Sequence, residues 1–186
     1  MARWFTMAIL VLFTSVATAV EVRFEPVAEN VYAHVGDIGA RSVANDGLNA
    51  NLGLVVTAAG AVLIDSGATW RSARDIQAAA RRVTSQPIRW VINTGGQDHR
   101  WLGNGYFQAQ GAELIAHASA VADMRSRGGD QLAALRSLLG AAANDTVPTL
   151  PTRLLEGPDT RLTLGGTVFE LRHRGGGHSM RPAKSP

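Results

Sequence analysis

The chain has 186 residues, of which 46% are hydrophobic and 18% charged, a composition typical of a single globular domain. The formal net charge is only +3 and acidic residues are scattered along the chain, so we predict no nucleic-acid partner despite a sequence pI of about 10.2. All but one of the 18 Lys and Arg residues are Arg, which raises the pI because arginine titrates only at very high pH. The chain has no Cys, so any bound metal would be held by His and carboxylate side chains.

Residues 1–19 have the pattern of a secretory signal peptide. Arg3 supplies a positive charge, residues 7–16 are apolar, and Ala17-Thr18-Ala19 has the small-x-small pattern of a cleavage site. The apolar stretch is shorter than the roughly 20 residues that cross a bilayer. We therefore expect cleavage after Ala19, a periplasmic or secreted bacterial protein, and no stable membrane anchor afterwards.

The next segments alternate strands and turns. Short strands are expected at residues 22–24 and 31–35, followed by an exposed loop over 37–48. Residues 51–57 and 61–65 form two β-rich runs joined by Ala58-Ala59-Gly60, which predicts a hairpin.

A helix and a parallel strand are predicted after this hairpin. Thr69 can cap a helix over residues 70–83, where apolar residues recur at helical spacing. Residues 88–93 form an apolar strand. Strand, helix and strand of these lengths imply a right-handed crossover between parallel strands.

The rest of the chain mixes short helices and strands. A polar loop over 95–100 is followed by a short helix starting near Asn104 and a strand at 112–116. Two helices are expected at 118–127 and 131–142, separated by Gly128-Gly129-Asp130. Their apolar stripe is interpreted as core, and its members are Met124, Leu132, Leu135, Leu138 and Leu139. After a connector at 146–151, residues 161–164 and 168–173 form a β-hairpin.

Four motifs stand in a recognisable order along the chain: the strand and turn from Ala61 to Gly67, Asn93-Thr94, Gly103-Asn104, and Gly177-His178-Ser179. Together they resemble the metallo-β-lactamase fold superfamily, over nearly the whole chain after residue 19. The likeness is greatest to exported bacterial hydrolase-like members associated with sulfur-oxidation and quinoprotein systems. It implies an α/β fold of layered αββα type with one or two zinc ions at one edge of the sheets.

The metal-binding motif of that family is altered in this chain. The family has HxHxDH between Asn-Thr and Gly-Asn, whereas this chain has Gly95-Gly96-Gln97-Asp98-His99-Arg100. An alignment without a gap places Gly95, Gln97, His99 and Arg100 at the ligand positions. A shift by one residue instead matches Asp98 and His99 to the last two ligands. Neither alignment retains the first pair of histidines.

The resemblance implies roles for individual residues. Asp98, His99 and His178 are the candidate zinc ligands, and Asp98 is also the candidate catalytic base. Asp65 would support the ligands through hydrogen bonds, while Gln97 and Trp101 would line a substrate site. The alternatives are a capping role for Asp65 and Asp98 and a surface position for His99 and His178. Of the remaining histidines, His34 and His117 are interpreted as structural, and His173 as a residue of the sheet surface rather than a ligand.

The family pattern stops after Ser179. The family continues with Pro-Gly-Asp and an apolar strand, whereas residues 180–186 have no strand pattern and contain the only Lys. We therefore expect residues 20–179 to be the N-terminal portion of one domain and 180–186 a non-family tail, as after a frameshift or truncation. The hairpin at 161–173 would then belong to a second sheet with an unpaired edge.

Two functions remain open at this stage. One is a hydrolase-like protein whose relatives use metal-activated water on an ester, thioester or lactam, with this chain weak or inactive. The other is an exported, non-catalytic module that kept the fold without zinc and binds a small molecule. A nucleic-acid-processing role is disfavoured by the signal peptide and the low net charge.

Overall fold

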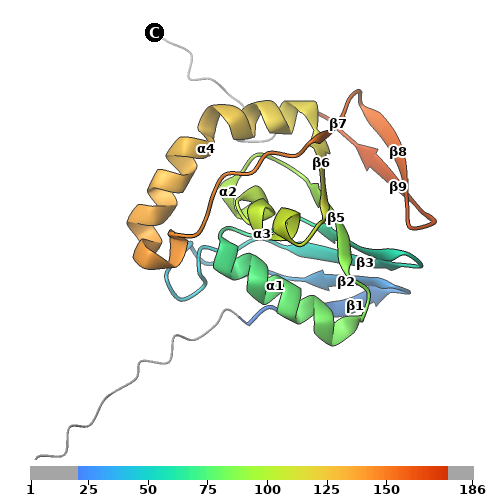
Figure 1. Cartoon of the computed structure of the whole chain (residues 1–186), viewed down its shortest axis with the longest axis horizontal. Coiled ribbons are helices and arrows are strands. Elements are labelled where there is room, and N and C mark those ends of the chain that lie inside the picture. The colour runs from blue at the N-terminus through green and yellow to red at the C-terminus, as the bar shows by residue number, and fades with distance from the viewer. Residues whose placement is uncertain (1–20, 176–186) are drawn as a thin grey trace, which may run out of the picture.

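A computed structural model describes residues 21–175 and contains two β-sheets and four α-helices in that part of the chain (Figure 1). Seven strands form the larger sheet in chain order, and they are β1 (Glu25–Ala28), β2 (Val31–His34), β3 (Leu52–Thr57), β4 (Gly60–Ile64), β5 (Ile88–Asn93), β6 (Glu113–His117) and β7 (Arg153–Leu155). The strands from β1 to β4 pair antiparallel, and those from β4 to β7 pair parallel. The mixed sheet confirms the expected α/β class.

The hairpin and the crossover that the sequence predicts are both present. β3 and β4 pair antiparallel, with Thr57 opposite Gly60 at the turn. Helix α1 (Trp70–Val83) begins at Thr69, whose side chain accepts a hydrogen bond from the Ser72 N–H while Ser72 returns one to the Thr69 backbone. This capping box fixes the start of the helix that joins β4 to the parallel strand β5.

The second half of the chain contains one long helix where two were expected. α2 (Asp98–Trp101) and α3 (Asn104–Ala109) are short, but α4 runs without a break over Ala118–Leu139 and ends in a 3-10 turn, Gly140–Ala143. Gly128 lies on the buried side of α4, where a Cβ atom would come within 2.8 Å of the Trp101 ring. The helix continues through its glycines because this face packs closely on the core, which outweighs their low helix propensity.

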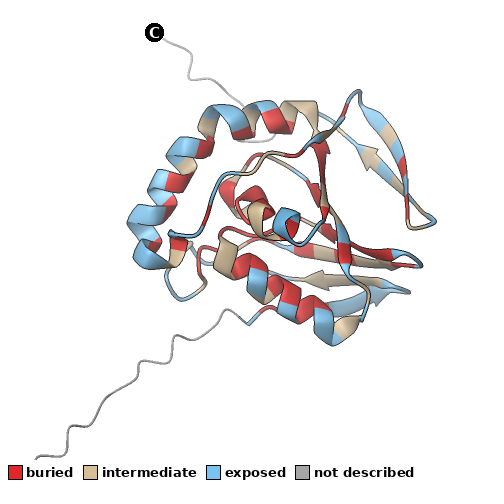
Figure 2. Cartoon of the chain, viewed as in Figure 1, coloured by how far each residue is buried: buried red, intermediate tan, exposed pale blue. Residues whose placement is uncertain are grey.

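The helices cover one face of the sheet (Figures 1 and 2). One core cluster lies between α1 and the sheet and includes Leu54, Leu63, Ile76 and Val91. A second lies under α4 and includes Trp101, Met124 and Leu135. Of the predicted apolar stripe on α4, Leu138 alone is exposed, at 42%.

A separate two-stranded sheet lies on the opposite face. It consists of β8 (Asp159–Leu164) and β9 (Thr167–Arg172), which pair antiparallel as predicted. Leu162 and Leu164 pack on Val62, Ile92 and Ile115 of the larger sheet. The strand residues Val55, Ile64 and Trp90 on this face stay only partly buried. A helix layer, a large sheet and a second, two-stranded sheet agree with the layered sandwich that we expected.

Some local predictions were wrong. The first strand is Glu25–Ala28 rather than 22–24, and Val22 and Phe24 are instead buried in the core cluster that includes Leu54 and Leu63. The loop over 37–48 is not fully exposed: Asp46 is buried, where it accepts a hydrogen bond from the Thr69 hydroxyl at 2.9 Å and pairs with Arg71 at 2.8 Å.

Residues 1–19, where we expect the signal peptide, and His178 lie outside the described residues. Within residues 21–175, no helix has the length and apolar character needed to cross a membrane.

Candidate functional site

The residues singled out by the sequence meet where β4 and β5 end. Asp65 follows β4, Thr94 follows β5, and the segment from Gly95 to Asn104 crosses beside them. Backbone bonds hold the turn in place: the Asp65 N–H donates to the Ile92 carbonyl at 2.9 Å. Loops at the carboxyl ends of parallel strands are where α/β proteins usually place their ligand sites.

Asp65 is bound to Thr94 through both of its carboxylate oxygens. Oδ1 accepts the Thr94 N–H at 2.7 Å, and Oδ2 accepts the Thr94 hydroxyl at 2.6 Å. Asp65 is 4% exposed and has a left-handed backbone with φ of 62°. Burial raises the pKa of Asp65 to about 6, against the opposing effect of the Thr94 hydrogen bonds and the positive charge of Arg100.

A network of buried amides fixes the segment that carries His99 and Arg100. The Arg100 carbonyl accepts hydrogen bonds from the Ser66 N–H at 2.9 Å and from Asn93 Nδ2 at 2.7 Å. Asn104 accepts from Ser66 Oγ and exchanges hydrogen bonds with Asn93. Gly103 lies so close to Ser66 that a Cβ atom would be 2.1 Å from its carbonyl oxygen. The turn after β4 and the segment 98–104 therefore form one rigid unit.

Asp98 is engaged by other groups of the chain at both carboxylate oxygens. Its Oδ1 accepts the backbone N–H of His99 at 2.9 Å, which places Asp98 at the start of α2. Its Oδ2 forms an ion pair with Arg41, a residue of the loop between β2 and β3. Asp98 is 7% exposed, so its negative charge is neutralised inside the protein by this guanidinium.

His99 lies beside this pair with a free ring nitrogen. Its Nδ1 is buried without a hydrogen-bond partner and lies 3.4 Å from Asp98 Oδ1. Burial lowers the pKa of His99 below its ordinary value, and the nearby charges of Arg100 and Arg41 lower it further. The imidazole is therefore neutral at pH 7.

The described residues do not fit a zinc ion. Within residues 21–175 no group of three His, Cys, Asp or Glu side chains is placed to hold a metal. Asp98 and His99 are adjacent, but Asp98 is already neutralised by Arg41, and a cation there would have to displace that guanidinium. A closed zinc site needs four ligands and a catalytic one three. His178, the third candidate, lies outside the described residues.

The other predicted residues are divided between the site and the core. Gln97 is partly buried beside Asp98 at the start of α2. Trp101 is fully buried under α4, where its indole N–H donates to Gln131 at 3.0 Å, so its ring does not reach a ligand cavity.

His117 and His173 form a stacked pair, with ring centroids 3.9 Å apart. His117 also caps α4 through its contact with Ser119, and both imidazoles line a cavity beside the β8–β9 hairpin.

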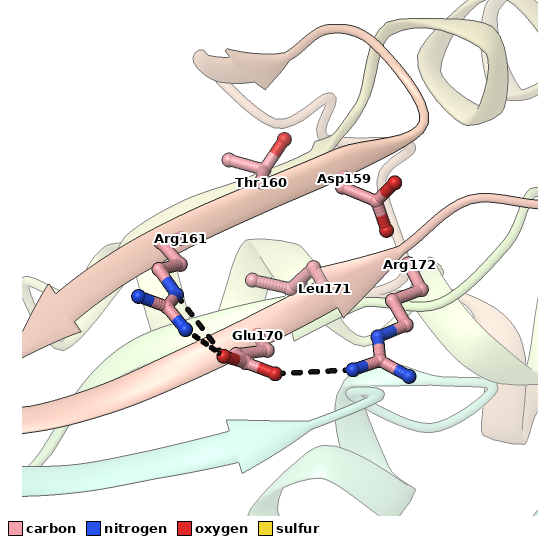
Figure 3. Close-up of a pocket in the computed structure, with 6 residues that line it drawn as sticks. All are labelled: Asp159, Thr160, Arg161, Glu170, Leu171 and Arg172. Carbon is pink, nitrogen blue, oxygen red and sulfur yellow. Dashed lines mark hydrogen bonds and ion pairs between the residues drawn. The ribbon is translucent and has the colours of Figure 1, made fainter.

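Two cavities adjoin this site. A polar cavity of about 470 Å³ is lined by Asn49, Ala50, Asn51, Leu52, Gly53, Ile64, Asp65, Thr94, His99 and Arg100. A second cavity of about 310 Å³ lies between the larger sheet and the β8–β9 hairpin. A third hollow, on the hairpin itself, is formed by exposed side chains in which Glu170 pairs with Arg161 and Arg172 (Figure 3). Its ion pairs are solvent-exposed, so we do not regard it as a binding site.

Sequence reasoning missed the roles of three residues at this site, of which Thr94 and Arg100 line the polar cavity and Arg41 pairs with Asp98. Arg41 comes from a distant loop with no motif around it, so no local signal pointed to its pairing with Asp98. Thr94 was noted only as part of the Asn-Thr motif, although it links Asp65 to Arg100 through its hydroxyl. Arg100 was noted as a substitution at a ligand position, and that substitution was the available signal for its role.

Solved structures share this fold. A metallo-beta-lactamase from Pontibacter korlensis is 21% identical and has a TM-score of 0.61, with 85% of this chain and 63% of that chain covered. The DIM-1 metallo-beta-lactamase, in a structure exposed to ceftazidime, is 18% identical at a TM-score of 0.61, covering 87% and 63%. The mono-zinc FIM-1 metallo-beta-lactamase from Pseudomonas aeruginosa is 20% identical at a TM-score of 0.50, covering 57% and 46%. No curated protein sequence matches significantly.

These likenesses establish the fold, and this chain spans less than two thirds of the length of each of the three proteins. A match to the sequence model of a protein family shows which superfamily the chain belongs to. The sequence model of the "Metallo-beta-lactamase superfamily" matches residues 45–181, which include the β3–β4 hairpin, the Asp65 turn and the segment 95–104. The chain belongs to the metallo-beta-lactamase superfamily.

Proposed function

We propose that this chain binds a small molecule in the polar cavity beside Asp65, Thr94 and Arg100 and does not carry out zinc-dependent hydrolysis. The observation that carries the proposal is the ion pair between Arg41 and Asp98. A guanidinium neutralises the carboxylate that the superfamily motif would offer to a metal. This carboxylate is a ligand position in the alignment shifted by one residue, whose first two ligand positions hold Thr94 and Gly96. The ungapped alignment has Gly95 and Gln97 there, so neither alignment supplies the first pair of histidines.

The cavity has the chemistry of a binding site. Its wall carries amide, hydroxyl, imidazole and guanidinium groups, and the network around Asn104 holds the segment behind it rigidly. Few, well-positioned polar groups in a concave site provide orientation and specificity for a small ligand. Binding by such a site requires no metal.

The second candidate function is the hydrolysis to which superfamily membership points. It is favoured by the buried Nδ1 of His99, which has no hydrogen-bond partner. In that case Asp98, His99 and His178 would act as ligands, Asp98 or a neighbour would hold the proton of the attacking water, and Arg41 would have to leave Asp98. The two candidates differ in whether the folded protein retains zinc.

Metal analysis after dialysis tests the proposal. We expect the protein, purified with zinc present, to retain much less than one zinc per chain and to show no zinc-dependent hydrolysis of a chromogenic ester or lactam. The triple variant Arg41→Ala, Gly95→His, Gln97→His should retain more zinc, because it adds two imidazoles and frees Asp98, and a Cβ atom at position 95 meets only Arg100, at 3.5 Å. Arg81→Ala is the matched control for loss of a guanidinium. Stoichiometric zinc in the unmodified chain, lost in His99→Ala, would overturn the proposal.

We also propose that the protein is exported, with residues 1–19 removed. The support is the sequence pattern alone: a charged start, a short apolar stretch and a small-x-small end. N-terminal sequencing of protein from a periplasmic fraction should begin at Val20. An intact Met1 in cytoplasmic protein would refute export.

A further inference from the structure

The polar cavity and the second cavity meet at two side chains. Ile64 and Thr94 line both cavities. Both residues lie where β4 and β5 end: Ile64 is on the sheet face that carries the β8–β9 hairpin, and Thr94 directly follows β5. A ligand that lies across Thr94 would therefore have one end in each cavity.

The polar cavity offers a cation to a ligand. Arg100 donates to the Thr94 hydroxyl at 2.8 Å and forms no ion pair with any residue from 21 to 175. The carboxyl group that lines this cavity, Asp65, feels the charge of Arg100 but is 4% exposed, and its two oxygens accept hydrogen bonds from Thr94. Asn51 adds a donor, since its Oδ1 accepts the Gly36 N–H at 3.0 Å and its Nδ2 is left for a ligand. The cavity therefore suits one anionic group.

The second cavity offers an apolar surface beside a few polar side chains. Ile64, Ile92 and Leu155 form the apolar part of its wall on the sheet, and Phe169 and Leu171 form that part on the hairpin. The stacked rings of His117 and His173 and the paired Glu170 and Arg172 also line the cavity. Its volume of about 310 Å³ accommodates a short alkyl chain or a single aromatic ring, and packing such a group against the apolar side chains removes apolar surface from water, which favours binding.

We propose that the ligand of this site is an amphipathic monocarboxylate, with its carboxylate at Arg100 and its alkyl or aryl body between Ile92 and Phe169. This inference rests on the proposed function and specifies its ligand. Arg100 pairs with the carboxylate, and the Asn51 and His99 side chains line the same cavity beside it. A small polar anion would leave the apolar walls uncovered, and a neutral alcohol would leave Arg100 without a counter-charge.

Calorimetric titration with octanoate tests this assignment. The matched probes are 1-octanol, which keeps the alkyl body, and acetate, which keeps the carboxylate. We expect octanoate to bind in the millimolar range or tighter and both probes to bind at least tenfold more weakly. Arg100→Gln should weaken octanoate binding about tenfold, because a hydrogen bond to a charged group contributes roughly that factor.

Controls separate the two ends of the site. Phe169→Ala should weaken octanoate and 1-octanol alike, whereas Arg81→Gln should leave octanoate binding unchanged, because Arg81 is exposed on α1 and does not line either cavity. Circular dichroism spectra confirm that each variant is folded. Absence of octanoate binding at millimolar concentration, or equal binding by Arg100→Gln, overturns the inference. Either result leaves the zinc measurement, which tests the proposed function, unaffected.

Discussion

Arg41 and Asp98 form an ion pair that joins the loop between β2 and β3 to the first turn of α2. Asp98 is nearly buried, while the side chain of Arg41 is about a third exposed, at 35%. The pair closes the loop over the segment that carries His99. It therefore both secures the loop and occupies the carboxylate that the superfamily motif would use for a metal.

Removal of Arg41 should destabilise the protein through Asp98. We expect Arg41→Ala to lower the free energy of unfolding by about 1–2 kcal/mol, less than for a fully buried pair because water reaches the guanidinium. Urea denaturation measures the change. In an Asp98→Asn background the same substitution should cost much less, since no buried charge is left unpaired. Equal costs in both backgrounds would show that the ion pair contributes nothing.

Asn104 should be among the most sensitive positions near the site. Its side chain bonds Ser66, Asn93 and the Thr149 carbonyl, and it is fully buried. Asn104→Ala leaves these partners unsatisfied, so we expect a loss of about 3 kcal/mol or more in unfolding free energy. Asn144→Ala, at an exposed position, is the control and should change stability by no more than about 0.5 kcal/mol. Thermal denaturation measures the melting temperatures of the two variants. Similar melting temperatures would contradict the prediction.

Asp65 should make stability fall as the pH rises from about 4 to about 6. The pKa of Asp65 is raised from 3.8 to about 6 in the folded state, so the folded protein binds more protons than the unfolded chain in this range. Stability supplied by the protonated carboxyl is therefore lost as the pH rises, by about 3 kcal/mol in total.

The variant Asp65→Asn tests whether Asp65 causes this pH dependence of stability. The variant cannot ionise at position 65, so its unfolding free energy should lack the decrease between pH 4 and pH 6, whatever its absolute stability. Denaturant titrations at several pH values in this range compare the two slopes. A variant with the same slope as the unmodified chain would show that another group causes the pH dependence.

Two adjacent glycines of α4 should respond in opposite ways to alanine. A Cβ at Gly128 would lie 2.8 Å from the buried Trp101 ring, whereas a Cβ at Gly129 would meet nothing within 4 Å. Gly128→Ala should cost about 1–3 kcal/mol from overpacking, and Gly129→Ala should stabilise the helix by about 0.5–1 kcal/mol. Melting temperatures of the two variants, each compared with that of the unmodified protein, measure these effects. A stabilising Gly128→Ala would mean that α4 does not pack on Trp101 as described.

Elements whose signals lie within a few residues of one another could be predicted from the sequence alone. Thr69 marks the start of α1 at Trp70, and the two β-rich runs joined by Ala58-Ala59-Gly60 predict the β3–β4 hairpin. Caps, turns and hydrophobic periods act within a few residues of one another, so they can be read without the fold. The superfamily was recognisable for the same reason, because its motifs are short and ordered along the chain.

Only the tertiary structure decided what depends on distant residues. Gly128 and Gly129 predicted a break, yet α4 is continuous, since Trp101 packs against the helix from another segment. The pairing of Arg41 with Asp98 joins residues far apart in sequence, and the buried position of Trp101 removes it from the cavity. Packing and ion pairing are set by proximity in space, and a local pattern carries no information about which distant side chain fills a given place.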